Sequence, residues 1–352
     1  MKVLVVTMGP GETAQGASVA QTMIKSGRDV TFGLVLEENK HFINLLNCPK
    51  YILPTPLEFI DLATKENFDY ILFCNSKIYK NFPKFRVSKP KIKSKTFSLD
   101  SNWLFRNETK YPYIEWLDKM FVNFTKEIFE IGLKQNGGHY SIASDAMEKI
   151  MPVGFIPENN LLTLAEKKAV RAKLGVGEHE KLFFSYFGIG VTKRLDLDQQ
   201  FIKVFLSMRL ENCKLIYVGD GEIGAPNIIK IDQPDSTTFY QYLASSDLVI
   251  QHQGLGTLEQ AIAAQIPTIN LVLPAPADES VNAGEWEVEA FQSLGLCRKI
   301  RTTEIAKLPE LIHQIIDSGT GSEMIKNQKE RYSPGNEKIM IEAEKIVEAG
   351  RS

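Results

Sequence analysis

Short apolar runs alternate with amphipathic stretches along this chain. Lys2–Thr7, Asp29–Val35 and Asn67–Cys74 are rich in β-branched and aromatic residues, which is typical of strands. Between the first two, Ala14–Ser26 has apolar residues on one face at helical spacing, and Gly27 follows it in the position of a helix C-cap. Strands that alternate with helices predict an α/β protein with a parallel sheet, covered by helices on both faces.

A second series of the same kind begins after Met151–Pro157, whose two prolines and glycine predict a stiff connector. Further strands are expected at Lys181–Phe187, Cys213–Val218, Ile228–Ile231, Val249–His252 and Thr268–Leu273. A chain of 352 residues is also long for a single core. We therefore expect an N-terminal domain at 1–157, a second domain at 158–333, and a C-terminal helix at 334–352 that packs back on the N-terminal domain.

Composition narrows the class of protein. Hydrophobic residues make up 43% and charged residues 24%, and the formal net charge is −2, so a globular protein is expected and no nucleic acid as a partner. The first apolar run is too short for a signal peptide, and no run approaches the ~20 residues of a membrane span. The four cysteines have no metal-binding spacing, so we expect buried thiols in a reducing cytoplasm.

The most informative segment is Asp247–Ala261, which reads DLVIQHQGLGTLEQA. It predicts a buried strand, a glycine turn and the start of a helix. The unpaired N–H groups and the positive dipole of such a helix start favour a phosphate, and Glu259, just inside the helix, can accept hydrogen bonds from a ribose. Together they indicate a nucleotide. The alternative is an ordinary strand–turn–helix in which Gly254 and Gly256 serve only the turn.

This segment and the one after it resemble the donor-binding region of the inverting UDP-glycosyltransferases and the MurG-like group, which have the GT-B fold. That pattern runs roughly H-G-G-x-G-T-x-x-E-A, then G-x-P, P-x-x-x-D-Q and N-A. The matching residues are His252, Gly254, Gly256, Thr257, Glu259, Ala261, Pro267, Pro274, Asp278, Asn282 and Ala283. The departures are Gln253 in place of the second glycine, Gln265 in place of the glycine of G-x-P, and Glu279 in place of glutamine.

The resemblance implies two Rossmann-like domains facing each other across a cleft, the first on the acceptor side and the second binding a nucleotide sugar, UDP-linked, as donor substrate. No separate cofactor is implied. The phosphates would lie on Gly254, Gly256 and Thr257, with His252 close by, and the ribose on Glu259. The sugar hydroxyls would contact Asp278 and Glu279. Further donor contacts are expected from Gly11 in the first loop and from Ile231 at the base. At the pyrophosphate they are expected from Gly188 and from Arg194, with Lys193 as the alternative basic residue. Arg194 has an alternative as a surface residue at a helix start.

The first loop, Thr7–Gly16, holds the candidate general base. Most relatives carry G-G-x-G-H in this loop, and Gly11-Glu12 looks like the acidic variant of some antibiotic and sterol glycosyltransferases. Inverting transfer needs a base that takes the proton of the acceptor hydroxyl, and we expect Glu12 to be that base. Its alternative is a cap on the first helix. Asp100, at a strand end, is a second candidate for base or acceptor orientation, with a turn-forming role as its alternative. His139 is the runner-up.

The sequence lacks two features that would indicate another type of reaction: a second glutamate near the helix start and a D-x-D pair at a strand end. Retaining GT-B enzymes place two glutamates eight positions apart around this helix start, and counting back from Glu259 leads to Gln251. The missing carboxylate favours inversion. Asp196-x-Asp198 falls on an expected helix, and no other D-x-D pair ends a strand, so no metal is expected.

The segment Lys77–Lys95 is strongly basic. Eight of its nineteen residues are lysine or arginine, none is acidic, and aromatic residues lie between them. This composition is typical of an interfacial membrane contact, although two prolines exclude a long amphipathic helix. We interpret it as a peripheral contact with the inner face of the cytoplasmic membrane, which would bring a lipid or lipid-linked sugar acceptor to the protein. The alternatives are binding of an anionic polymer or nucleic acid, and a solvated, flexible loop.

The sequence therefore predicts an inverting, metal-independent glycosyltransferase of hexosyltransferase type, with a UDP-linked donor and a hydroxyl acceptor. Two alternatives stay open. One is a GT-B enzyme that hydrolyses or epimerises the sugar nucleotide itself. The other is a catalytically inactive nucleotide-sugar-binding subunit, which the departures at Gln253, Gln265 and Glu279 and the loss of the usual histidine keep open.

Overall fold

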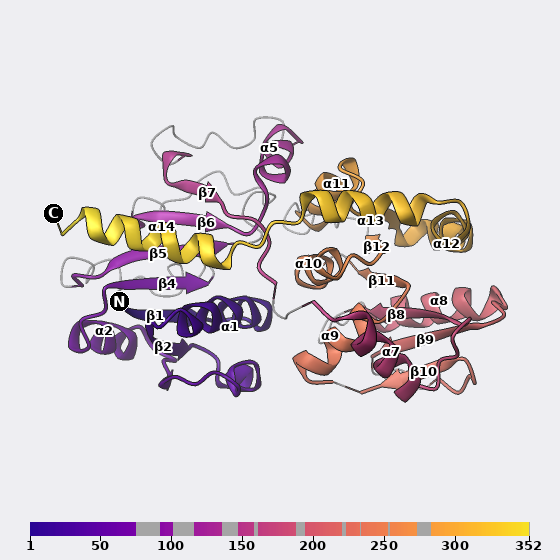
Figure 1. Ribbon diagram of the computed structural model, residues 1–352, viewed down its shortest axis with the longest axis horizontal. Coiled ribbons are helices and arrows are strands. Elements are labelled where there is room, and N and C mark those ends of the chain that lie inside the picture. The colour runs from indigo at the N-terminus through magenta and orange to yellow at the C-terminus, as the bar shows by residue number, and fades with distance from the viewer. Residues whose placement is uncertain are drawn as a thin grey trace. The chain divides into compact units, whose positions relative to one another are not determined.

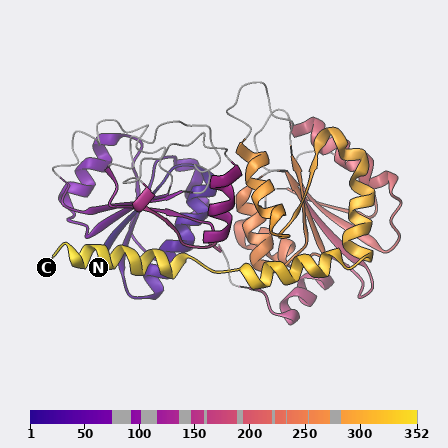
Figure 2. The same cartoon turned by 90° about the horizontal axis from the view of Figure 1, so that it is seen from above.

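The computed structural model describes residues 1–74, 92–100, 116–135, 147–157, 161–187, 194–219, 223–232, 234–252, 254–272 and 283–351. The chain divides into two compact units, Met1–Glu158 with Ser333–Ser352 (unit 1) and Asn159–Tyr332 (unit 2). Each unit is a parallel sheet with helices on both faces (Figures 1 and 2). The prediction of two parallel α/β sheets is confirmed.

Within the described residues, the sheet of unit 1 has seven parallel strands in the order β3-β2-β1-β4-β5-β6-β7. The strands are β1 (Lys2–Thr7), β2 (Asp29–Leu34), β3 (Lys50–Ile52), β4 (Tyr70–Cys74), β5 (Lys95–Asp100), β6 (Lys119–Val122) and β7 (Ile150–Pro152). The central strand β1 places Thr7 opposite Leu34 of β2 and Cys74 of β4. Side chains on both faces of β1 and β4 are buried, which explains why their sequences are continuous apolar runs.

The described helices of unit 1 are α1 (Pro10–Lys25), η1 (Glu37–Ile43), α2 (Pro56–Lys65), α5 (Lys126–Gln135) and α14 (Asn336–Ala349). Helix α1 begins earlier than the apolar pattern predicts, because Pro10 occupies its first turn and Gly9 is its N-cap. Helix α2 begins with a capping box between Thr55 and Glu58 and packs on the opposite face of the sheet from α1.

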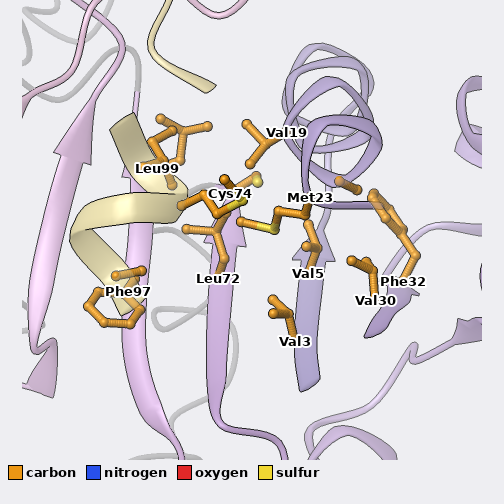
Figure 3. Packing of buried hydrophobic residues seen from close by; sticks show 14 of the residues in the cluster. Val3, Val5, Val19, Met23, Val30, Phe32, Leu72, Cys74, Phe97 and Leu99 are labelled. Carbon is orange, nitrogen blue, oxygen red and sulfur yellow. The ribbon is translucent and has the colours of Figure 1, made fainter. Parts of the chain in front are cut away.

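Helices α1 and α14 share one hydrophobic core with the sheet (Figure 3). Val19 and Met23 of α1 lie among side chains of β1, β2, β4 and β5, and α14 adds Ile339, Met340, Ala343 and Val347 to the same cluster. Asn336, the first residue of α14, also contacts α1: its Nδ2 donates to Ser18 Oγ at 2.8 Å. The C-terminal helix is therefore part of the core of unit 1.

Within the described residues, the sheet of unit 2 has six parallel strands in the order β10-β9-β8-β11-β12-β13. The strands are β8 (Lys181–Tyr186), β9 (Cys213–Val218), β10 (Ile228–Ile231), β11 (Leu248–His252), β12 (Thr268–Val272) and β13 (Arg298–Arg301). The helices are α7 (Leu164–Lys173), α8 (Arg194–Ser207), α9 (Ser236–Ala244), α10 (Leu255–Ala264), α11 (Ala283–Ser293), η6 (Thr302–Lys307), α12 (Leu308–Asp317) and α13 (Thr320–Arg331). Helices α8 and α12 pack on one face of the sheet, and α9 and α10 on the other.

The two chain segments that leave unit 1 are tied to each other. Phe155 N donates to Ser333 O at 2.8 Å, and Gly335 N donates to Phe155 O at 2.6 Å. The close approach depends on Gly154, whose φ is +105° and where a Cβ atom would lie directly against the Ser333 carbonyl. Only glycine adopts this conformation and leaves this space without strain.

Gly154→Ala should lower the free energy of unfolding by about 3 kcal/mol, because the left-handed backbone and the clash with Ser333 add together. Gly27→Ala is the matched control, since Gly27 has a φ of +78° but nothing within 4 Å of a Cβ position. It should cost about 1 kcal/mol, from the backbone alone. Urea unfolding of both variants measures the difference, and equal losses would contradict a steric role for Gly154.

Candidate functional site

The N-terminus of α10 follows directly from the carboxyl end of β11. Gly254 is the N-cap, with φ −148° and ψ 122°, and it provides no side-chain hydrogen bond to the first turn. Leu255 is buried against the unit, which fixes the direction of the helix, whereas Gly256 and Thr257 are partly exposed. The first turn thus offers backbone N–H groups and the positive end of the helix dipole at the edge where open α/β sheets bind ligands.

The two glycines of this turn are not required by the backbone. Neither has a positive φ, so a residue with a side chain could adopt either conformation. A Cβ at Gly256 would meet nothing within 4 Å, and a Cβ at Gly254 would have only ordinary contacts, with the His252 ring 3.5 Å away and the His252 carbonyl 3.8 Å away. Among the described residues, the absent side chains therefore leave the helix start uncovered. This argues against the interpretation that Gly254 and Gly256 serve only the turn.

His252 lies beside this uncovered turn. It ends β11, is partly exposed, and its ring lies close to Gly254, with Cε1 and Nδ1 3.5 and 3.7 Å from the position of a Cβ there. An imidazole here can donate a hydrogen bond to an anion that lies on the first turn of α10. The structure thus brings together four of the predicted donor-site residues: His252, Gly254, Gly256 and Thr257.

Glu259 occupies a different environment. It lies in the middle of α10 and is only 2% exposed. Burial raises the pKa of Tyr332 to about 12, and the nearby charge of Glu259 adds to the effect. Tyr332 caps the C-terminus of α13, which packs on α10. The carboxylate predicted to bind ribose is thus buried near a tyrosine of unit 2.

The other predicted donor contacts are only partly described. Ile231 ends the edge strand β10, at the same edge of the sheet as His252, and is partly exposed. Arg194 is the first residue of α8, but its side chain is outside the described residues. Outside them entirely lie Gly188, Asp278 and Glu279, together with Gln253 and His139.

In unit 1, Glu12 lies in the first turn of α1 and is partly exposed. Its side chain folds back over the N-cap, since a Cβ at Gly9 would collide with the Glu12 carboxylate. Glutamate at this position of a helix is favourable near the unpaired N–H groups, so the geometry is compatible with a cap. Gly11, in the same turn, is exposed, and a Cβ there would meet nothing within 4 Å.

Cys74 lies within electrostatic range of both candidate catalytic carboxylates. It ends β4, while Asp100 ends the neighbouring β5 and Thr7 the neighbouring β1. Burial raises the pKa of the Cys74 thiol well above its usual value, and the charges of Glu12 and Asp100 raise it further. Glu12 and Asp100, far apart in sequence, therefore act on the same buried group. With a raised pKa, Cys74 is a neutral thiol rather than a nucleophile. The sequence did not predict Cys74 as a site residue, and its position at the end of a strand was the only feature that could have indicated it.

Metal and membrane features are limited in the part of the chain that the structure describes. No group of three or more His, Cys, Asp or Glu side chains there is arranged to hold a metal ion. No helix in this part is long and apolar enough to cross a membrane. Of the basic segment Lys77–Lys95, only Ile92–Lys95 is described, and Lys95 pairs with Asp118 at 3.3 Å.

Comparison with known proteins gives the fold. No protein-family model and no curated protein sequence matches the chain. Arabidopsis thaliana UGT89C1 complexed with quercetin has a TM-score of 0.71 at 12% identity, over 98% of this chain and 99% of that one. Acinetobacter baumannii MurG has a TM-score of 0.64 at 11% identity, over 98% and 99%. A putative UDP-N-acetylglucosamine 2-epimerase from Listeria monocytogenes has a TM-score of 0.63 at 15% identity, over 97% and 94%. The predicted GT-B fold is confirmed.

Gly256→Ala tests whether the first turn of α10 is a ligand site or only an exposed helix start. Alanine should raise the stability of unit 2 by about 0.5–1 kcal/mol, because the site has room for a methyl group and alanine favours the helix. It should lower the affinity for UDP about tenfold, because the methyl group occupies the space of a phosphate. Calorimetric titration with UDP measures the affinity.

Gly224→Ala is the control for this experiment, since a Cβ there also meets nothing within 4 Å but lies outside α10. It should leave the affinity for UDP unchanged. Wild-type UDP affinity in Gly256→Ala would show that no phosphate approaches this turn.

Proposed function

We propose that this chain is a glycosyltransferase that moves a sugar from a UDP-linked donor to a hydroxyl acceptor. The observation that carries the proposal is the uncovered N-terminus of α10 with His252 beside it, on a chain with the GT-B fold. A diphosphate needs positive potential and donors. The helix dipole, the first-turn N–H groups and an imidazole supply both.

Solved structures with the same fold support a UDP-linked donor. Phytolacca americana UGT2 is complexed with UDP-2-fluoro-glucose and pterostilbene, and Arabidopsis thaliana UGT89C1 has been solved with UDP. For this chain we assign the phosphates to Gly254, Gly256 and Thr257, and the ribose to Glu259. The remaining donor contacts that we propose are Gly11, Gly188, Arg194, Ile231, Asp278 and Glu279.

The proposed transfer is a single displacement. The acceptor oxygen attacks the anomeric carbon, the bond from that carbon to the diphosphate oxygen breaks, and UDP leaves with the electron pair. The acceptor proton passes to a carboxylate of unit 1, Glu12 in the first instance and Asp100 in the second. Attack opposite the leaving group inverts the anomeric centre. The dipole of α10 and His252 stabilise the departing diphosphate, so no metal step is needed.

The proposed function is tested by UDP release from a panel of nucleotide sugars, with and without an extract of membrane lipids. Release that requires the extract supports a transferase with a lipid or lipid-linked acceptor and identifies the donor. Release without the extract, or conversion of the sugar, supports a hydrolase or epimerase instead. The similarity to the Listeria monocytogenes epimerase structure is the observation that favours this second candidate. Binding of UDP without turnover would indicate an inactive binding subunit.

Glu12→Gln should reduce turnover by about a thousandfold, because glutamine cannot accept the acceptor proton. The affinity for UDP should stay within about twofold of wild type, since the phosphate site is on α10. Glutamine also caps a helix from this position, so the stability of unit 1 should change little. Retained turnover would remove Glu12 as base. Asp100→Asn, measured in parallel, tests the second carboxylate in the same way.

A membrane location completes the proposal. The basic and aromatic segment Lys77–Lys95 would hold unit 1 against an anionic leaflet at the inner face of the cytoplasmic membrane, where each cation contributes about 1 kcal/mol. A lipid or lipid-linked acceptor would reach the protein from that leaflet. Sedimentation with liposomes should recover the protein only when anionic lipid is present, and equal recovery on neutral liposomes would contradict electrostatic docking.

A further inference from the structure

The side chain of Gln251 links three elements at the proposed phosphate site. Gln251 immediately precedes His252 in β11, pairs in register with Asn270 of β12, and is 1% exposed. Its Nε2 donates to Asn270 Oδ1 at 2.6 Å and to the Gly254 carbonyl at 3.3 Å. One amide group therefore joins the ends of two neighbouring strands to the N-cap of α10.

The Gly254 carbonyl is the point at which α10 begins. It accepts the first helical hydrogen bond, from Leu258 N at 3.4 Å. A glycine N-cap has wide backbone freedom and brings no side chain to hold the first turn. If the turn is to stay bare for a ligand, its orientation must be fixed from elsewhere. The Nε2 group of Gln251 restrains this carbonyl from inside the sheet.

Only the donor end of the Gln251 amide is paired among the described residues. Gln251 Oε1 is buried and has no hydrogen-bond partner among the described residues. An unpaired buried carbonyl costs free energy, and an apolar side chain of the same length would fill the space without that cost. The stabilising contacts of the Gln251 side chain are those of its Nε2 donor. The donor acts on the Gly254 carbonyl and on Asn270.

We propose that Gln251 is a positioning residue, which sets the direction of the first-turn N–H groups of α10 toward a nucleotide diphosphate. The inference rests on the proposed function for the identity of the ligand. The proposal also gives position 251 a role in this chain. From the sequence alone, Gln251 was notable only because retaining GT-B enzymes have a glutamate there. A carboxylate would place its charge against two acceptor oxygens.

Gln251→Met and Gln251→Glu test this role by two measurements. Hydrogen exchange at 255–258, measured at the Leu258 amide that donates to the Gly254 carbonyl, reports the order of the first turn without any ligand. Calorimetry reports the affinity for UDP. Gln251→Met should speed exchange at 255–258 about tenfold and weaken UDP binding about tenfold. Gln251→Glu should show the same losses at about pH 9.5, above the raised pKa of a buried carboxyl group, where the side chain is charged and has no donor.

The glutamate variant adds a pH dependence that a general loss of packing would not produce. Burial raises the pKa of a carboxyl group, so at about pH 5.5 the introduced acid is protonated. It then regains one O–H donor, which can serve either the Gly254 carbonyl or Asn270 Oδ1. We expect its UDP affinity to rise severalfold between about pH 9.5 and about pH 5.5, relative to wild type measured at the same pH. Gln251→Met should show no such recovery.

Gln328→Met is the matched control. Gln328 is fully buried in the same unit, and its Nε2 donates to Ile266 O at 3.0 Å and Leu296 O at 2.9 Å, beyond the opposite end of α10. This variant should lose stability while exchange at 255–258 and UDP affinity stay at wild-type values. Losses equal to those of Gln251→Met would overturn the specific role of Gln251.

The outcomes separate the two proposals. Wild-type exchange at 255–258 in Gln251→Met, or wild-type UDP affinity in that variant, overturns the positioning role. Failure of the wild-type protein to bind UDP overturns the proposed function, while the exchange measurement still decides whether Gln251 orders the turn. If Gln251→Met does not fold, recovery of Gln251→Glu at about pH 5.5 supports the role, and its absence overturns it.

Discussion

The common direction of the strands is the constraint on which the rest of this structure depends. In a parallel sheet, all carboxyl ends reach one edge, and each following helix begins there with unpaired N–H groups. At that edge of unit 1 lie Thr7, Cys74 and Asp100, and α1 begins nearby with Glu12. At the corresponding edge of unit 2 lies His252, and α10 begins nearby. Polar groups from distant parts of the sequence meet because the strands share a direction.

The C-terminal segment is held in unit 1 mainly by burial of apolar surface. Ile339 and Met340 of α14 are almost fully buried in the core shared with α1, and each such side chain contributes about 1.5–3 kcal/mol. The bidentate ion pair between Arg28 and Glu344, with both distances at 2.7 Å, is partly exposed to solvent and contributes about 1 kcal/mol or less. Hydrophobic packing therefore dominates, and the ion pair adds one contact between α14 and the residue that precedes β2.

The glycines of this chain have different structural roles, which the sequence alone does not distinguish. Gly16 makes room for Thr7 and Cys74, because a Cβ there would collide with both side chains. Gly154 allows two crossing segments to bond. Gly254 and Gly256 have neither role, and their bare surface gives α10 its open first turn. The space around each glycine thus separates those required by packing or backbone conformation from those that are not, and only the tertiary structure shows it.

Local sequence determined the elements of this protein. Continuous apolar runs, helical periodicity and the glycine turn after His252 predicted the strands and α10, because each depends on residues close in the chain. Contacts between distant residues were decided by tertiary structure alone. The sequence showed Gln251 only as a position without a carboxylate, and pairing with Asn270 turned it into a brace for the Gly254 carbonyl. Likewise, the packing of α10 on α13 buried Glu259 near Tyr332. Periodicity carries no record of such partners, since their meeting depends on strand order and helix packing rather than on spacing along the chain.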